Sequence, residues 1–166
     1  ALCTGGSLVI CPKSALLEPE QLYGMLHEQR ITCGEFVPAV VRSLLGYLEK
    51  TEQELSFMRL LIVGSEISHG SEYSALKNYC GADVRVINSY GTAETTIDSS
   101  WYEAAEVELD SLTSSVALPI GQPFPGTQLY VCDTQLNLLP VGVPGELCIG
   151  GEGVAQGYVG NAALTA

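Results

Sequence analysis

The chain has 166 residues, of which 46% are hydrophobic, so it is long enough to bury a sizeable core. Seven Lys and Arg oppose 19 Asp and Glu, which gives a net charge of −12, and the basic residues do not cluster. This charge argues against a nucleic-acid partner. No apolar run approaches the ~20 residues that span a bilayer, and no signal peptide opens the chain. We therefore expect a soluble cytoplasmic protein that does not bind membranes.

The six cysteines contain no C-x-x-C pair, and His27 and His69 are the only histidines. Because zinc sites need paired ligands at short spacing, the sequence argues against a structural metal. Most of the cysteines lie in or beside apolar runs, so we expect reduced, buried small hydrophobes. They are Cys3, Cys11, Cys33, Cys80, Cys132 and Cys148.

Four short apolar runs in the first part of the chain predict strands, and the stretches between them are long enough for helices. The runs cover residues 7–11, 31–36, 59–63 and 84–87. Helices are expected from Pro19 to about Gln29, from Pro38 through Leu48, and from about Ser71 to Tyr79. Alternating strands and helices predict an α/β fold with a mainly parallel sheet flanked by helices.

After about Ser111 the pattern changes, because Gly and Pro become frequent and helical periodicity ends. Short runs at 128–132 and 146–149 predict antiparallel strands, with a turn at 141–145 between them. We therefore expect an α/β piece at 1–110 that carries the site and a β-rich piece at 111–166. The chain begins without Met and stops where a helix begins, so we expect it to be part of a longer domain.

Polar residues follow three of the predicted strands. They are Glu35, the turn Gly64-Ser65-Glu66, and the run NSYGTAETT from Asn88 to Thr96. Since the carboxyl ends of parallel strands meet at one edge, where open α/β sheets bind ligands, these residues should converge.

Within the NSYGTAETT run, each residue type has a plausible task. Asn88 can pair with a planar base edge, and Tyr90 offers a ring face for stacking. Gly91 permits close backbone approach, and Glu94 is a hard-oxygen ligand for a divalent cation.

The NSYGTAETT run resembles the N-x-Y-G-P-T-E motif of adenylation domains, the amino-acid-activating modules of nonribosomal peptide synthetases in the adenylate-forming superfamily. Residues 145–158, GELCIGGEGVAQGY, are similar to the GELxIxGxGxARGYL motif of the same family, and Pro119 to Pro123 lies between the two as expected. The resemblance covers nearly the whole chain. It implies a large α/β subdomain followed by a distorted β-barrel subdomain.

The resemblance also implies roles for individual residues. Adenine would lie between the Gly64-Ser65-Glu66 turn and Tyr90, beside Asn88, Ser89 and Gly91, and Glu94 would bind the Mg²⁺ that accompanies ATP. Ala93 stands where the family has Thr, so Thr92 or Thr95 is the candidate for the missing phosphate-binding hydroxyl. Gln156 replaces the usual Arg. From the residues themselves, we expect the glycines of 145–157 to form turns and Tyr158 to serve in packing.

By resemblance, the pocket for the substrate side chain is formed by Glu35, Leu61, Val63, Ser89, Ile97 and Asp98. Glu35 is the only charge in residues 31–37, and a buried carboxylate needs a cation or water; the alternative is an exposed Glu at a strand end. Two carboxylates on an aliphatic wall favour arginine as substrate. Tyrosine is the alternative, and lysine is a weaker third.

The implied reaction joins an amino acid to ATP as an aminoacyl adenylate, and then transfers the acyl group to the phosphopantetheine thiol of a carrier. Peptidyl carrier and condensation domains of the same synthetase are the implied partners. An acyl-CoA or aryl-acid ligase and a non-catalytic ligand-binding α/β module are the alternatives. The family's phosphate loop, ribose-binding aspartate and catalytic lysine are not found in the sequence, so we expect the chain alone to be inactive.

Overall fold

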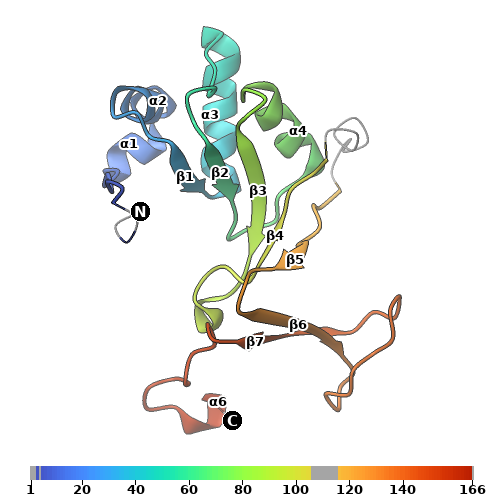
Figure 1. The fold of residues 1–166 in the computed structure, drawn as a ribbon. Coiled ribbons are helices and arrows are strands. Elements are labelled where there is room, and N and C mark those ends of the chain that lie inside the picture. Colours follow the sequence, from blue (N-terminus) through green and yellow to red (C-terminus); the bar gives the residue numbers. More distant parts are fainter. Residues whose placement is uncertain (1–2, 4, 106–115, 166) are drawn as a thin grey trace. The chain divides into compact units, whose positions relative to one another are not determined.

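The computed structural model describes residues 3, 5–105 and 116–165 and divides into two compact units (Figure 1). The first unit contains residues 1–88 and 103–118, and the second contains 89–102 and 119–166. The predicted boundary between residues 110 and 111 lies outside the described residues.

The first unit is built on three parallel strands, as the sequence predicts. Strand β1 is Cys33–Phe36, β2 is Leu60–Val63, and β3 is Arg85–Tyr90, whose last two residues belong to the second unit. In this register Phe36 pairs with Val63, and Val63 pairs with Asn88. The carboxyl ends of β1 and β2 therefore lie level at one edge of the sheet, and β3 runs two residues further.

Helices fill the connections between these strands. They are α1 (Lys13–Leu17), α2 (Pro19–Glu28), α3 (Pro38–Thr51) and α4 (Gly70–Asn78). Pro19 and Pro38 open α2 and α3 at the first turn, where the missing N–H costs nothing. Helix α3 packs against both α2 and α4, and its Leu44 and Leu48 are fully buried. The predicted helices are confirmed within a few residues, while α1 is an addition.

The run at residues 7–11 was expected to be a strand, and this prediction is wrong. It has no regular structure, and Leu8 and Ile10 are 67% and 85% exposed. A strand is stable only when its backbone groups pair with a neighbouring strand, so apolar composition alone is insufficient.

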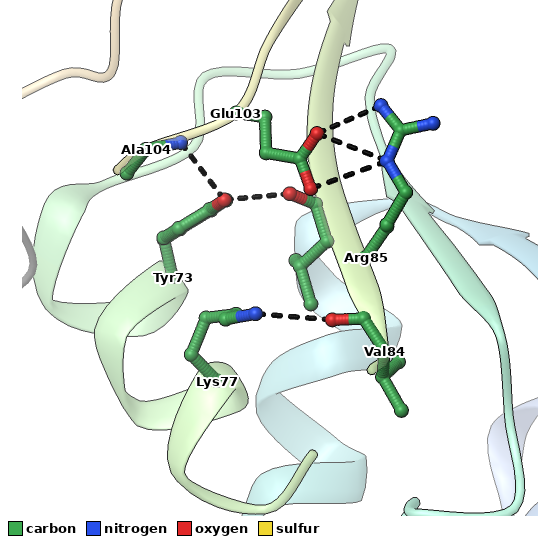
Figure 2. A network of polar contacts seen from close by, with 7 residues as sticks. Tyr73, Lys77, Val84, Arg85, Glu103 and Ala104 are labelled. Carbon is green, nitrogen blue, oxygen red and sulfur yellow. Dashed lines mark hydrogen bonds and ion pairs between the residues drawn. The ribbon is translucent and has the colours of Figure 1, made fainter. Parts of the chain in front are cut away.

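A buried tyrosine ties β3 to α4 and to the segment that follows β4 (Figure 2). The Tyr73 hydroxyl donates to the Val86 carbonyl at 2.6 Å and accepts from the Ala104 N–H at 3.1 Å. Tyr73 is only 4% exposed, so both bonds are shielded from water. The side chain thus fixes the backbone of the central strand.

Two cationic side chains add to this network, Lys77 from α4 and Arg85 from β3. Lys77 donates to the Val84 carbonyl at 3.0 Å, and the Arg85 guanidinium contacts the Glu103 carboxylate at 2.7 Å (Figure 2). The Arg85 side chain is half exposed, so the ion pair contributes little to stability.

The second unit contains two antiparallel pairs. Strand β4 (Ser100–Tyr102) pairs with β5 (Gln122–Pro123), and β6 (Thr127–Cys132) pairs with β7 (Glu146–Gly151). The short helix η2 (Ala93–Thr95) lies in the loop after β3, and α6 (Ala162–Thr165) follows β7. The predicted antiparallel strands at 128–132 and 146–149 are confirmed, and so is the turn between them.

The cysteines are free, as expected, but most of them are not buried. Cys132 alone among the six is buried, while Cys3 and Cys33 are exposed and the other three are half-buried. Cys33 shows the reason, because it lies on β1, the edge strand of the sheet. An apolar run at a sheet edge is not covered on every side.

Candidate functional site

The carboxyl ends of β1, β2 and β3 lie at one edge of the sheet, as predicted. Glu35 is the third residue of β1, Gly64 follows β2 directly, and Asn88 lies opposite the last residue of β2. The Gly64 N–H donates to the Phe36 carbonyl at 3.2 Å, which extends the pairing by one residue. Ser65 then turns the chain with φ 69°, and both Ser65 and Glu66 are exposed.

The side chains assigned to the substrate pocket in this unit differ in burial. Leu61 and Val63 are 1% and 6% exposed, and Val63 lines a small apolar cavity beside Val41 and Leu76. Because successive residues of a strand point to opposite faces, Leu61 and Val63 share the helix-covered face. Glu35 is exposed, so the burial expected for its carboxylate is not observed.

The loop after β3 belongs to the second unit and is unusually tight at Gly91. A Cβ at this position would lie 1.8 Å from the Ile97 carbonyl oxygen and 2.7 Å from the Ser99 nitrogen. The Ser99 N–H donates to the Tyr90 carbonyl at 2.8 Å, which closes the loop. Gly91 does permit close backbone approach, and the approaching group is the loop's own backbone.

Two threonines organise the start of η2 through their hydroxyls. Thr92 and Thr95 form a reciprocal capping box, with the Thr92 N–H donating to Thr95 Oγ1 at 3.2 Å. Thr95 Oγ1 also lies 2.7 Å from Ser99 Oγ. The Thr95 hydroxyl is therefore already engaged within the loop.

Further along this loop, Thr96 and Ile97 have φ of 61° and 70°. Such left-handed conformations are rare for β-branched residues and mark local strain. Ile97 is 61% exposed, and Asp98 is half-buried. Ser89 is 3% exposed, and among the described residues its hydroxyl has no hydrogen-bond partner.

Glu94 is exposed, yet several donors hold its carboxylate. The Tyr158 hydroxyl donates to Glu94 Oε1, and the backbone N–H of Glu94 and the Thr92 hydroxyl also bond to the carboxylate. These bonds, with that of Tyr158 first, lower the pKa of Glu94, and the same contact raises the pKa of Tyr158. Tyr158 was expected to serve in packing; the structure leaves it 41% exposed and has its hydroxyl bonded to a carboxylate.

The glycine-rich segment after β7 lies along the same loop. The Ala155 N–H donates to the Glu94 carbonyl at 2.7 Å, and the Thr96 hydroxyl donates to the Gly153 carbonyl at 2.7 Å. A Cβ at Gly153 would lie 3.0 Å from the Thr95 carbonyl oxygen. The two sequence motifs, far apart in the chain, thus contact each other within one unit.

Between them lies a cavity of about 570 Å³, within the usual range for small-molecule sites. One wall comes from the loop after β3 and is largely polar, and another comes from β7 and is aliphatic. The lining residues are Tyr90, Thr92, Ala93, Glu94 and Thr95, then Leu147 and Ile149, and finally Val154, Ala155, Gln156, Gly157, Tyr158, Leu164 and Thr165.

The donors in this cavity suit magnesium better than zinc. Within residues 3, 5–105 and 116–165, no three His, Cys, Asp or Glu side chains gather into a possible metal centre. Among the described residues that line the cavity, Glu94 has the one carboxylate side chain. Mg²⁺ is commonly held by one or two carboxylates together with substrate phosphates and water, so this donor set fits it.

Residues 1–159 match the family described as AMP-binding enzyme. The chain belongs to this family. It is 44% identical to tyrocidine synthase 3 of Brevibacillus parabrevis, over 99% of the chain and 2% of that protein. It is 40% identical to gramicidin S synthase 2 of Brevibacillus brevis, over the whole chain and 4% of that protein. The chain thus spans only a few per cent of the length of these relatives.

Solved structures agree with this membership. A four-domain nonribosomal peptide synthetase bound to AMP and glycine is 30% identical, with a TM-score of 0.81, over 98% of the chain and 11% of that structure. The N-terminal subdomain of Klebsiella oxytoca NpsA, at 22% identity and a TM-score of 0.75, covers 96% of the chain and 38% of that subdomain, and supports the fold. The adenylation-domain resemblance and the α/β fold class are confirmed. No helix among the described residues is long and apolar enough to cross a membrane.

Proposed function

We propose that this chain is part of an adenylation domain that activates an amino acid with ATP for nonribosomal peptide synthesis. The cavity in the second unit carries the proposal, because both family motifs line it and Glu94 lies on its polar wall. The amino acid carboxylate attacks the α-phosphate, and aminoacyl adenylate and pyrophosphate result.

Each motif residue has a proposed role in nucleotide binding. The resemblance gives Tyr90 the role of stacking on adenine and makes the turn of Gly64, Ser65 and Glu66 a further adenine contact. The neighbouring Asn88, Ser89 and Gly91 complete the nucleotide site. Thr92 or Thr95 stands in for the phosphate-binding hydroxyl that Ala93 lacks; each hydroxyl already has a partner within the loop, the Glu94 carboxylate for Thr92 and the Ser99 hydroxyl for Thr95.

Glu94 is the proposed ligand for Mg²⁺. When bound, the cation offsets the negative charge that gathers around the α-phosphate. The lowered pKa of Glu94 keeps its carboxylate ionised down to more acidic pH than an ordinary Glu. The protein's own contribution is thus an oriented, ionised oxygen donor in a cavity of suitable size.

The activated acyl group then passes to a phosphopantetheine thiol. We propose a peptidyl carrier domain as the partner that bears this arm, and a condensation domain as the next partner in the same synthetase. Because the reaction consumes ATP and free amino acids, we place it in the cytoplasm.

The proposed amino acid is arginine or tyrosine, with lysine a weaker third. The resemblance assigns carboxylates to Glu35 and Asp98, an aliphatic wall to Leu61, Val63 and Ile97, and a hydroxyl to Ser89. In the register of β1 and β2, Glu35 pairs with Ile62 and so lies on the face opposite to Leu61 and Val63, which leaves Ile97 as the aliphatic side chain of the wall for such a ligand. The unpartnered hydroxyl of Ser89 supports a polar contact, because a buried hydroxyl without a partner costs about 1–3 kcal/mol. A guanidinium can form paired, charge-assisted bonds with one carboxylate while its methylenes lie on the wall.

Amino-acid-dependent ATP–pyrophosphate exchange by the full-length protein tests the proposal. We expect exchange with arginine or tyrosine. A Glu94→Ala variant should lose more than about tenfold in exchange rate, because the loss of a residue that only orients a metal ligand already lowers metal affinity or activity by about tenfold or more. Exchange that depends on a fatty or aryl acid instead would favour the ligase alternative. Nucleotide binding without exchange would favour a non-catalytic module.

A Glu35→Ala variant tests the substrate assignment separately. It should reduce arginine activation about tenfold or more, because a charge-assisted bond contributes roughly 1.5–3 kcal/mol, and leave leucine activation nearly unchanged. A wild-type preference for valine or leucine, or an unchanged ratio of arginine to leucine activation in the variant, would show that this assignment is mistaken.

A further inference from the structure

Glu94 lies on an exposed loop, where a Glu side chain ordinarily samples several rotamers. Here the Tyr158 hydroxyl bonds to its carboxylate, and the two residues are 64 positions apart in the chain. A carboxylate has about four lone-pair sites, so the donors present leave capacity for a cation. The contact thus restricts the Glu94 side chain and still leaves a lone pair of its carboxylate available to a cation.

The backbone that carries Tyr158 is itself held in place. The Tyr158 N–H donates to Thr165 Oγ1 at 2.9 Å, and Thr165 Oγ1 in turn donates to the Asn161 carbonyl at 2.9 Å. On the other side, the Ala155 N–H is bonded to the carbonyl of Glu94 itself at 2.7 Å. The hydrogen bonds of the Ala155 and Tyr158 N–H groups therefore hold the backbone so that the Tyr158 hydroxyl lies at the Glu94 carboxylate.

We propose that Tyr158 is a positioning residue, which prearranges the Glu94 carboxylate for the divalent cation that accompanies the nucleotide. The proposal rests on the proposed function, because it takes Glu94 as the metal ligand. Partners that orient a ligand typically change metal affinity by about 10–100-fold, and an exposed ligand such as Glu94 has the most orientational freedom to lose.

The test compares binding of AMPPNP, a slowly hydrolysed ATP analogue, with and without Mg²⁺, by calorimetry on the full-length protein. The ratio of the two dissociation constants measures how much the metal contributes to binding. In Tyr158→Phe we expect this ratio to fall about tenfold. The affinity for metal-free AMPPNP should stay unchanged, because the ring remains and only its hydroxyl is lost.

Tyr130→Phe is the matched control. Tyr130 is 40% exposed and Tyr158 is 41% exposed, and the Tyr130 hydroxyl also donates to a side-chain oxygen, Gln128 Oε1, at 2.8 Å. Tyr130 does not line the cavity, so its loss should leave both dissociation constants unchanged. A magnesium effect that falls equally in both variants would overturn the proposal, because any exposed tyrosine would then have the same influence.

Three further outcomes separate the two proposals. If Glu94→Gln abolishes the magnesium effect while Tyr158→Phe keeps it in full, or strengthens it, the positioning role is wrong and the metal role of Glu94 stands. If Glu94→Gln keeps the magnesium effect, both roles are wrong. If Tyr158→Phe weakens metal-free and magnesium-bound AMPPNP equally, Tyr158 acts on the nucleotide or on the shape of the cavity, and the positioning role is again wrong.

Discussion

Gly91→Ala should disrupt the loop that carries Glu94. The added methyl would lie 1.8 Å from the Ile97 carbonyl oxygen, more than 1 Å closer than an ordinary contact, so the backbone must move. Two bonds resist this movement: the Ile97 N–H to the Thr92 carbonyl at 3.0 Å and the Ser99 N–H to the Tyr90 carbonyl at 2.8 Å. Overpacking costs about 1–3 kcal/mol and each lost bond about 1 kcal/mol, so we expect destabilisation of about 2–5 kcal/mol.

Denaturant unfolding of the intact protein measures this loss, and hydrogen exchange locates it at the amides of Ile97 and Ser99. Gly46→Ala is the control, because it makes the same chemical change in the interior of α3, where nothing lies within 4 Å of the new methyl. It should stabilise the protein by about 0.5–1 kcal/mol. If Gly91→Ala were as stable as Gly46→Ala, the packing account of this loop would be refuted.

Three other changes probe separate features. Tyr73→Phe removes a buried hydroxyl that joins two backbone groups and should cost about 1–3 kcal/mol in a denaturant titration; no loss would show that water replaces it. A hydrogen bond from Arg59 lowers the pKa of the Cys33 thiol, and burial raises that of Cys80 to about 11. Near neutral pH Cys33 therefore holds more thiolate, and peptide mass spectrometry should find that iodoacetamide labels it faster than Cys80; equal rates, or no slowing of Cys33 in Arg59→Ala, would contradict this. Ala93→Thr restores the family hydroxyl and should leave pyrophosphate exchange unchanged or faster, whereas slower exchange would show that the loop excludes it.

The sequence predicts the core of the first unit well, because its signals there are local. Pro19 and Pro38 mark helix starts, and leucines at helical spacing mark the buried faces that follow. Strands β2 and β3 are predicted because short β-branched runs fit buried parallel strands. The run at 7–11 has similar composition but no strand, since pairing is a property of two segments.

The two shortest strands, β4 and β5, could not be predicted from the sequence for a related reason. They contain only three and two residues, too few to show an alternating pattern. Their positions depend on contacts rather than composition. The Phe124 N–H donates to the Ser99 carbonyl at 3.1 Å, and the carbonyl of Trp101 would lie 2.0 Å from a Cβ on Gly121.

The candidate site, too, is predictable from the sequence only in part. That the strand ends meet at one edge follows from parallel topology, and the register of β1, β2 and β3 confirms it. For Glu35 the sequence left both burial and exposure open, because a lone charge in an apolar run does not show which face it occupies, and the structure has it exposed. The roles of individual side chains at this edge stay predictions.

The contact between Glu94 and Tyr158 could not be found from periodicity, which relates residues only a few positions apart. It depends on where the glycine-rich segment meets the loop. Gly153 lies close against that loop, where a Cβ would come within 3.0 Å of the Thr95 carbonyl oxygen, and the Ala155 N–H bonds to the Glu94 carbonyl two residues later. From there the chain needs three more residues to bring a hydroxyl to the carboxylate. The length of this segment sets where the hydroxyl lies, and so a change such as Gln156 in place of Arg is compatible with an intact contact.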